Sequence, residues 1–261
     1  MLKIATVSLN PKWQDKKANQ KVCEAYISYA SMQKLELIIF PEMTLTGFSM
    51  DFKAIGEDEK DSTTLTFFSH LAQKYHIAII FGMVFFDGDF GKNSAIFIDE
   101  CGKIRANYIK IHPFSLADED LYYSKGSHIE VVDFKNYHIA LSICYDLRFT
   151  PLYFILANQS DIIINIASWP KKRLVHWETL LKARAIENQL YMIGVNRTGM
   201  DGNGFEYDES SHIFDANGEE VEILESFKLL KIYEISKDKT EKFKLRFDTT
   251  KDKRGELYKK L

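Results

Sequence analysis

The sequence predicts a layered α/β fold built around a mostly buried, mixed β-sheet. Short apolar runs such as Leu35–Phe40 and Asp161–Ile166 recur along the chain, as is typical of strands buried on both faces. Helical patterns alternate with these runs over the first two thirds, and further strand pairs lie between them. No linker or shift in composition divides the chain, so we expect one domain over residues 1–261.

The first half of the chain predicts strands and helices in alternation. The helices are Asn19–Gln33 and Ser62–Tyr75, and the second opens with the serine and threonine residues that favour a helix N-terminus. The expected strands are Ile4–Leu9, Leu35–Phe40, Ile77–Phe81, Val84–Phe86, Ser94–Ile98 and Ile104–Ile109.

The second half begins with a polar loop, His112–Gly126. Helices are expected after Thr150-Pro151 and over Leu174–Gln189. The expected strands are Ile129–Phe134, Ile139–Ile143, Asp161–Ile166, Tyr191–Asn196 and Leu229–Ile235, with short strands near Ile213 and Val221. From Lys237 onward the chain carries ten Lys/Arg against five Asp/Glu, which indicates a solvated, basic tail.

Composition limits the kinds of partner. A net charge of −3 gives no electrostatic reason to expect nucleic acid. No signal peptide and no apolar run long enough for a membrane span is present, so we expect no membrane partner. Three widely spaced cysteines fit a reducing cytoplasm, and the histidines lack the spacing of metal ligands, so we expect no metal or cofactor.

The segment Tyr137–Pro151, YHIALSICYDLRFTP, predicts a nucleophile. Apolar residues lead to Cys144 at the end of a buried strand, a polar turn follows, and Thr150-Pro151 has the pattern of an N-cap and first helical residue. A thiol on a strand-to-helix elbow has backbone N–H groups beside it, the arrangement of a nucleophile with an oxyanion site. Alternatively, Cys144 is an ordinary buried cysteine.

Two further reactive groups stand at strand ends. Glu42 follows Leu35–Phe40, and Lys110 follows Ile104–Ile109. Ligands of α/β sheets bind at the carboxyl ends of strands, so we expect both near Cys144. Glu42 would accept and return the thiol proton, while Lys110 and the Tyr145 N–H would stabilise the thiolate and an oxyanion. Taken singly, Glu42 could cap a turn and Lys110 could be a surface lysine.

Three segments, LIIFPEMTLTGF, YIKIHPF and ALSICYDLRFTP, resemble the signatures of the nitrilase (carbon–nitrogen hydrolase) superfamily. The resemblance implies an αββα sandwich that assembles as a homodimer or larger homo-oligomer. It also implies that Glu42 is the general base and acid, Lys110 the oxyanion stabiliser and Cys144 the nucleophile. The second glutamate of the family falls on Glu119, in the loop FSLADEDLYYSKG.

Within the superfamily the chain most resembles the omega-amidases, which implies hydrolysis of the terminal amide of small dicarboxylate monoamides such as 2-oxoglutaramate and 2-oxosuccinamate. We assign Arg173 to the free carboxylate of such a substrate, because a guanidinium can bind a carboxylate through two hydrogen bonds. Alternatively, Arg173 belongs to a solvent-facing basic run with Lys171 and Lys172. Further candidate substrate-binding residues are Tyr145, Phe114 and Trp169, although the last two could equally be core or interface aromatics. By the same resemblance we interpret three charged residues as structural ion-pair partners: Arg148, Arg184 and Glu187.

Several alternatives stay open at this point. The chain could be an N-carbamoyl amino acid hydrolase, another aliphatic amidase or a nitrilase, all of which would share the same reactive residues. It could also be a non-catalytic binding protein on this fold. A redox role for Cys144 is weaker, because no resolving cysteine lies near it in the sequence.

Overall fold

Two mixed sheets, face to face, form the centre of the computed structural model, which describes residues 1–258 and residue 260. The first has the order β13-β14-β1-β2-β3-β4-β5 and the second the order β12-β9-β8-β7-β6. The strands of the first are β1 Leu2–Val7, β2 Leu37–Ile39, β3 Ala78–Asp87, β4 Phe90–Ile98, β5 Ile104–Ile109, β13 Glu225–Phe227 and β14 Leu230–Ile235. Those of the second are β6 Val131–Phe134, β7 Tyr137–Ile143, β8 Ile162–Ala167, β9 Tyr191–Asn196 and β12 His212–Phe214.

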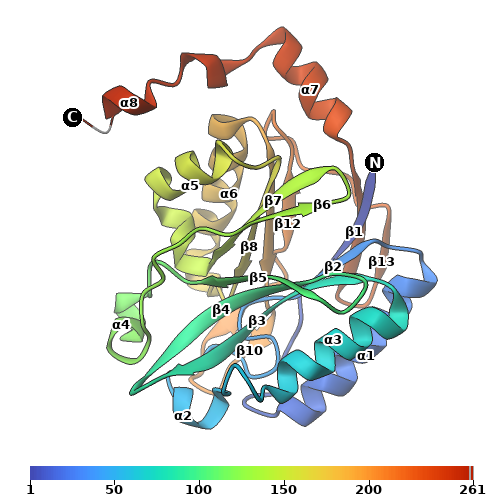
Figure 1. Cartoon of the computed structure of the whole chain (residues 1–261), viewed down its shortest axis with the longest axis vertical. Coiled ribbons are helices and arrows are strands. Elements are labelled where there is room, and N and C mark those ends of the chain that lie inside the picture. Colours follow the sequence, from blue (N-terminus) through green and yellow to red (C-terminus); the bar gives the residue numbers. More distant parts are fainter. Residues whose placement is uncertain (259, 261) are drawn as a thin grey trace.

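Helices cover the outer face of each sheet (Figure 1). Helices α1 (Lys16–Met32) and α3 (Thr63–Tyr75) share a core with the first sheet. Helices α5 (Thr150–Ala157) and α6 (Leu174–Asn188) pack against the second sheet, and the same apolar cluster reaches between the two sheets. The layers therefore follow the order α, β, β, α, and the predicted fold class is confirmed. Burial of these apolar faces is the main stabilising contribution.

Each sheet contains three neighbouring strands that run in parallel. β1 pairs with β2 and β2 with β3 in parallel, and β7 pairs with β8 and β8 with β9 in the same way. The carboxyl ends of β2 and β7 therefore each open onto one edge of their sheet. Glu42 and Cys144 follow these two ends, whereas Lys110 follows β5, which pairs antiparallel with β4.

Short elements complete the fold. A two-stranded sheet joins β10 (Gly199–Met200) to β11 (Glu206–Tyr207). The short helices are α2 Phe52–Ile55, η1 Ser115–Ala117, α4 Glu119–Tyr122, η2 Cys144–Arg148, η3 Lys171–Arg173, η4 Thr249–Asp252 and α8 Gly255–Tyr258.

Three local predictions were wrong. The two strands expected over residues 77–86 are one continuous strand, β3, because β4 pairs with it without a break from Ile79 to Asp87. Thr150 is the first residue of α5 rather than its N-cap, a position that Phe149 takes. No strand forms at Val221, where the structure has only a single bridge between Phe214 and Glu220.

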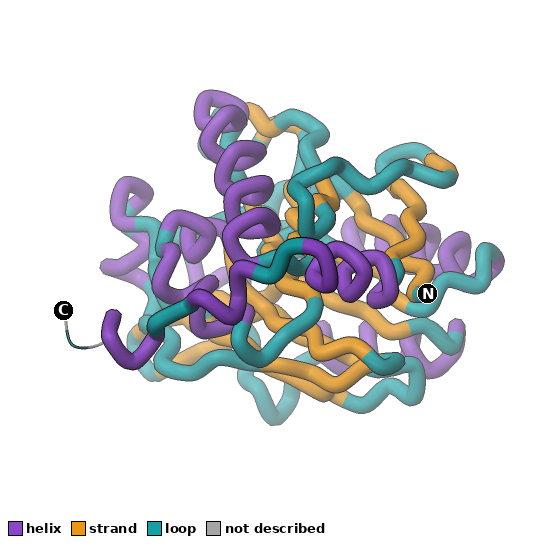
Figure 2. Tube along the Cα trace, turned by 90° about the horizontal axis from the view of Figure 1, so that it is seen from above, coloured by secondary structure: helices purple, strands orange, loops and turns teal. Residues whose placement is uncertain are grey.

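The basic tail forms a helix, α7 (Lys237–Arg246), none of whose residues is buried. Beyond it, the Gln189 side chain bonds the backbone of Phe247 and of Thr249, at 2.9 Å each, so the tail is tied to the end of α6. Seen from above in Figure 2, the tail helices cross over the strands. No helix of the described residues has the length and apolar character needed to cross a bilayer.

Candidate active site

The structure brings together the residues expected at the strand ends. Glu42 lies in the turn after β2, Lys110 directly follows β5, and Cys144 directly follows β7. All three are almost completely buried, with exposed fractions of 1%, 1% and 7%. Because β2 and β5 belong to one sheet and β7 to the other, the site lies where the two sheets face each other.

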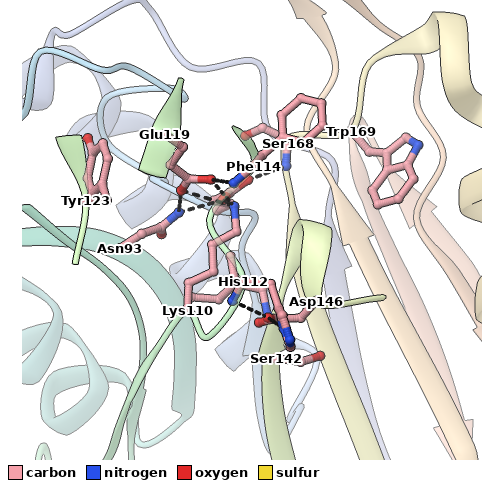
Figure 3. Close-up of polar contacts among 12 residues, drawn as sticks. Asn93, Lys110, His112, Phe114, Glu119, Tyr123, Ser142, Asp146, Ser168 and Trp169 are labelled. Carbon is pink, nitrogen blue, oxygen red and sulfur yellow. Dashed lines mark hydrogen bonds and ion pairs between the residues drawn. The ribbon is translucent and has the colours of Figure 1, made fainter. Parts of the chain in front are cut away.

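Lys110 is held between two carboxylates (Figure 3). Its ammonium Nζ lies 2.9 Å from Glu42 Oε1 and 2.8 Å from Glu119 Oε2. Glu119 is the first residue of α4 rather than part of an open loop, and its Oε2 accepts a 2.6 Å hydrogen bond from the Phe114 backbone N–H. The Glu119 carboxylate is therefore fixed from two sides.

Asn93 joins the two carboxylates, and it was not among the residues predicted for the site. Its side-chain Nδ2 donates to Glu42 Oε1 at 2.7 Å and to Glu119 Oε1 at 2.8 Å. No local pattern distinguishes it, because Lys92 and Ser94 lie beside it in strand β4. A buried carboxylate needs such donors, because an unpaired buried charge is costly.

The electrostatics of this cluster fix which groups are charged. Burial by itself lowers the pKa of Lys110, but Glu119 and Glu42 outweigh it and hold that pKa well above its usual value. Lys110 therefore stays an ammonium ion. Burial raises the pKa of Glu119, and the negative charge of Glu42 raises it further against the opposing effect of Lys110.

Cys144 adopts a left-handed backbone conformation, φ +45°, at the start of η2. Such a φ in a residue other than glycine is strained, and it recurs at functional sites. Burial and then the charge of Glu42 raise the pKa of the Cys144 thiol well above its usual value, and Lys110 only partly opposes them. Lys110 acts in the direction expected of a group that stabilises the thiolate, but burial and Glu42 outweigh it, so the thiol needs a base to remove its proton.

A buried carboxylate anchors the elbow. Asp146 accepts hydrogen bonds from the Ile143 backbone N–H at 3.0 Å and from the Tyr108 hydroxyl at 2.7 Å. Its other oxygen accepts the His112 backbone N–H at 3.0 Å and contacts His112 Nδ1 at 2.8 Å (Figure 3). Asp146 was not singled out from the sequence.

Cys144 opens onto a pocket of about 450 Å³. The four residues expected to bind substrate all line it: Tyr145, Phe114, Trp169 and Arg173. The pocket lining does not include the buried charged residues Glu42, Lys110 and Glu119. Two residues of the lining contact them directly. The Ser168 backbone N–H donates to Glu42 Oε2 at 2.8 Å, and the Phe48 ring lies 5.3 Å from Lys110 Nζ.

Two arginines line this pocket, and one was misinterpreted. Arg173 lies over the Phe114 ring at 5.2 Å, as a pocket position requires. Arg148 was expected to form a structural ion pair, but within the described residues no carboxylate lies within ion-pair distance of it. Its guanidinium instead faces the pocket beside Trp169, at 4.9 Å. The expected pair of Arg184 and Glu187 does form, at 3.0 Å.

The described residues contain no cluster of three or more histidine, cysteine or acidic side chains arranged to hold a metal ion. The site that they do form comprises a thiol on a strained elbow, a buried ammonium with two carboxylates, and a pocket lined by aromatic side chains.

An αββα sandwich with such a site is that of a hydrolase that cleaves carbon–nitrogen bonds. The chain belongs to the carbon-nitrogen hydrolase family, whose model matches residues 3–244. The resemblance to the nitrilase superfamily and the assignment as an enzyme acting on amides are thereby confirmed.

Curated relatives include two proteins named as amidases of this kind. Omega-amidase YafV of Escherichia coli is 34% identical over 218 residues, which cover 84% of this chain and 83% of that protein. The 2-oxoglutaramate amidase of Paenarthrobacter nicotinovorans is 31% identical over 239 residues, covering 86% of this chain and 80% of that protein.

Solved structures share the fold. A CN-hydrolase superfamily protein from Xanthomonas campestris, with an arsenic adduct in its active site, matches with a TM-score of 0.88 at 29% identity over 97% of each chain. An amidase from Nesterenkonia also gives a TM-score of 0.88, over 99% of this chain and 96% of that chain. Its identity of 20% makes it evidence for the fold alone.

Proposed function

We propose that the protein is an omega-amidase, which hydrolyses the terminal amide of small dicarboxylate monoamides such as 2-oxoglutaramate and 2-oxosuccinamate to an acid and ammonia. The observation that carries the proposal is a pocket with a buried thiol, Cys144, and an arginine, Arg173, that no described carboxylate neutralises. An amide with a free carboxylate at its other end matches both groups.

In the first half of the proposed reaction, Cys144 Sγ bonds to the amide carbon and its proton passes to Glu42. The oxyanion that forms receives the charge of Lys110 and a hydrogen bond from the Tyr145 backbone N–H, which belongs to the first turn of η2. The carbon–nitrogen bond then breaks, the nitrogen takes the proton from Glu42, and ammonia leaves a thioester on Cys144.

In the second half, water attacks the thioester carbon and gives a proton to Glu42. The carbon–sulfur bond breaks, the sulfur regains the proton, and the acid leaves. Glu119 holds the Lys110 ammonium toward the site through its 2.8 Å contact, and it orients the substrate beside it. A neutral resting thiol fits this sequence, because Glu42 accepts the thiol proton only as the new bond forms.

The substrate carboxylate contacts Arg173, with Phe114 and Trp169 as pocket walls. Arg173 and Trp169 are also linked directly, since the Trp169 indole N–H donates to the Arg173 carbonyl at 2.8 Å. The names of the relatives, omega-amidase and 2-oxoglutaramate amidase, agree with this substrate class.

Related hydrolases are the main alternatives. An N-carbamoyl amino acid hydrolase also takes an anionic substrate. The substrates of a simple aliphatic amidase or a nitrilase carry no carboxylate, so they would leave Arg173 without a partner. A binding protein without catalysis has no need of a thiol placed beside a buried base. The proposal also includes one domain, a homodimer or larger homo-oligomer and a cytoplasmic location. Sedimentation velocity tests the oligomeric state.

The test is ammonia release from 2-oxoglutaramate, succinamate, N-carbamoyl-β-alanine and a simple nitrile, with Cys144→Ala as the control. We expect turnover of the first two substrates and none by the variant. Turnover of another compound alone would replace the substrate class. Wild-type rates from Cys144→Ala would refute the thioester mechanism.

A further inference from the structure

Arg148 occupies a defined place in the pocket wall. It belongs to η2, four residues after Cys144, and its guanidinium lies 4.9 Å from the Trp169 ring and 5.8 Å from the Tyr145 ring. Its Nη2 bonds His176 Nδ1 on α6 at 3.1 Å. Because an arginine nitrogen can only donate, His176 Nδ1 is the acceptor here. Stacking and this hydrogen bond hold the guanidinium in place before a ligand binds.

The two pocket arginines lie along one row of aromatic rings. Arg173 lies over Phe114, Phe114 lies 4.9 Å from Tyr145, and Arg148 lies over Tyr145. The row therefore carries two guanidinium groups on adjacent rings of the same pocket. Each remains free to donate further hydrogen bonds toward the pocket.

The charges around these arginines are unbalanced. Within the described part of the chain, Asp118 is the only carboxylate that lines the pocket, and it is solvent-exposed. Neither arginine has a described ion-pair partner, whereas Lys171 nearby has two, Glu206 and Asp208. A single substrate carboxylate neutralises only one of the two guanidinium groups, so a second acceptor on the substrate would satisfy the other.

We propose that Arg148 is a specificity-determining residue that donates a hydrogen bond to an oxygen at carbon 2 of the substrate, so that the enzyme selects 2-oxo acid monoamides. This inference rests on the proposed function. Arg173 takes the carboxylate and Arg148 the neighbouring 2-oxo oxygen. The same guanidinium rejects a 2-ammonium group, because arginine has no acceptor to offer and both groups are positive. Glutamine and asparagine are excluded for that reason.

The test compares substrates that differ only at carbon 2. We would measure kcat and KM for 2-oxoglutaramate, glutaramate, which has no group at carbon 2, and L-glutamine. The enzymes are the wild type, Arg148→Met, Arg148→Lys and, as a control, Arg105→Met. Arg105 is a partly exposed arginine paired with Asp99 outside the pocket. Thermal melting checks that each variant is folded.

We expect the ratio of kcat/KM for 2-oxoglutaramate to that for glutaramate to fall by about tenfold or more in Arg148→Met, mainly through KM. Glutaramate turnover should change little, and Arg105→Met should behave as the wild type. Arg148→Lys keeps the charge but loses the planar fork, so it should recover only part of the ratio and should still exclude glutamine.

Two outcomes overturn the inference. An equal fall for both monoamides would show that Arg148 only supports the fold, and an unchanged ratio would show that it does not contact carbon 2. In either case the wild type still hydrolyses both monoamides, so the proposed function stands. A wild type that hydrolyses neither monoamide refutes the proposed function, and this inference with it.

Discussion

The Tyr108 hydroxyl donates a 2.7 Å hydrogen bond to the carboxylate of Asp146. Tyr108 lies in β5, two residues before Lys110, and Asp146 lies in η2, two residues after Cys144. This hydrogen bond therefore connects the strand that precedes Lys110 to the turn that begins with Cys144. His112, two residues after Lys110, bonds the same carboxylate through its backbone N–H. Asp146 thus fixes where Lys110 and Cys144 lie relative to each other.

The first prediction concerns Asp146→Asn. An amide cannot accept all the hydrogen bonds that the carboxylate accepts, so buried donors lose their partner. We expect a loss of about 1–3 kcal/mol in the free energy of unfolding, measured by urea denaturation. kcat/KM should fall more than in Tyr108→Phe, the control that removes one bond. A variant with wild-type kcat would show that the elbow does not depend on Asp146.

The second prediction concerns the buried cluster. Lys110→Met leaves the carboxylates of Glu42 and Glu119 buried without their cation, so we expect a loss of about 3–5 kcal/mol in stability together with loss of activity. The matched control is Lys74→Met, which removes a solvent-exposed pair with Glu24 and should leave the free energy of unfolding nearly unchanged. Equal unfolding midpoints for the two variants would contradict this account.

The third prediction concerns the pH dependence of Cys144 alkylation. Burial and Glu42 raise the pKa of this thiol, so its thiolate should form only above the ordinary thiol value of about 8.5. The rate of iodoacetamide addition, followed by peptide mass spectrometry, should therefore still rise with pH above that value. In Glu42→Gln one negative charge is gone, and the midpoint should move to lower pH. A wild-type midpoint near neutrality would contradict the expected burial effect.

Much of this site was predictable because its chemistry lies at strand ends. An apolar run shows where a buried strand stops, and parallel strands bring such ends to one edge, which located Glu42, Lys110 and Cys144. The alternation of helices and strands predicted only a layered α/β fold, and the αββα order of the layers followed from the family resemblance.

Asn93 and Arg148 were not predictable in this way, because their roles depend on partners far away in the sequence. Asn93 matters only because β4 places it between Glu42 and Glu119. The orientation of Arg148 is set by Trp169 and by His176 on α6, and no local pattern reports those contacts. Strand β3 was divided in the prediction for a different reason: Gly82 interrupts its apolar run, whereas the hairpin pairing with β4 continues through that residue.

The last prediction concerns Gly82 in β3, which lies against the turn that carries Glu42. A Cβ at this position would lie 2.4 Å from the Met43 backbone nitrogen and 2.8 Å from the Glu42 Cα. The Gly82 backbone also bonds Thr44 through both its N–H, at 3.0 Å, and its carbonyl, at 2.9 Å. The turn therefore rests directly on a strand that has no side chain at that point.

Gly82→Ala should push this turn away from β3 and move the Glu42 carboxylate from Lys110. We expect a large loss of kcat, measured as ammonia release. Gly88→Ala is the control: its Cβ would meet no atom within 4 Å, so only its φ of +62° carries a cost, of about 1 kcal/mol. A Gly82→Ala variant that loses stability but keeps the wild-type kcat would show that catalysis does not require Glu42 at this fixed position. That outcome would contradict the role of Glu42 as the proton carrier.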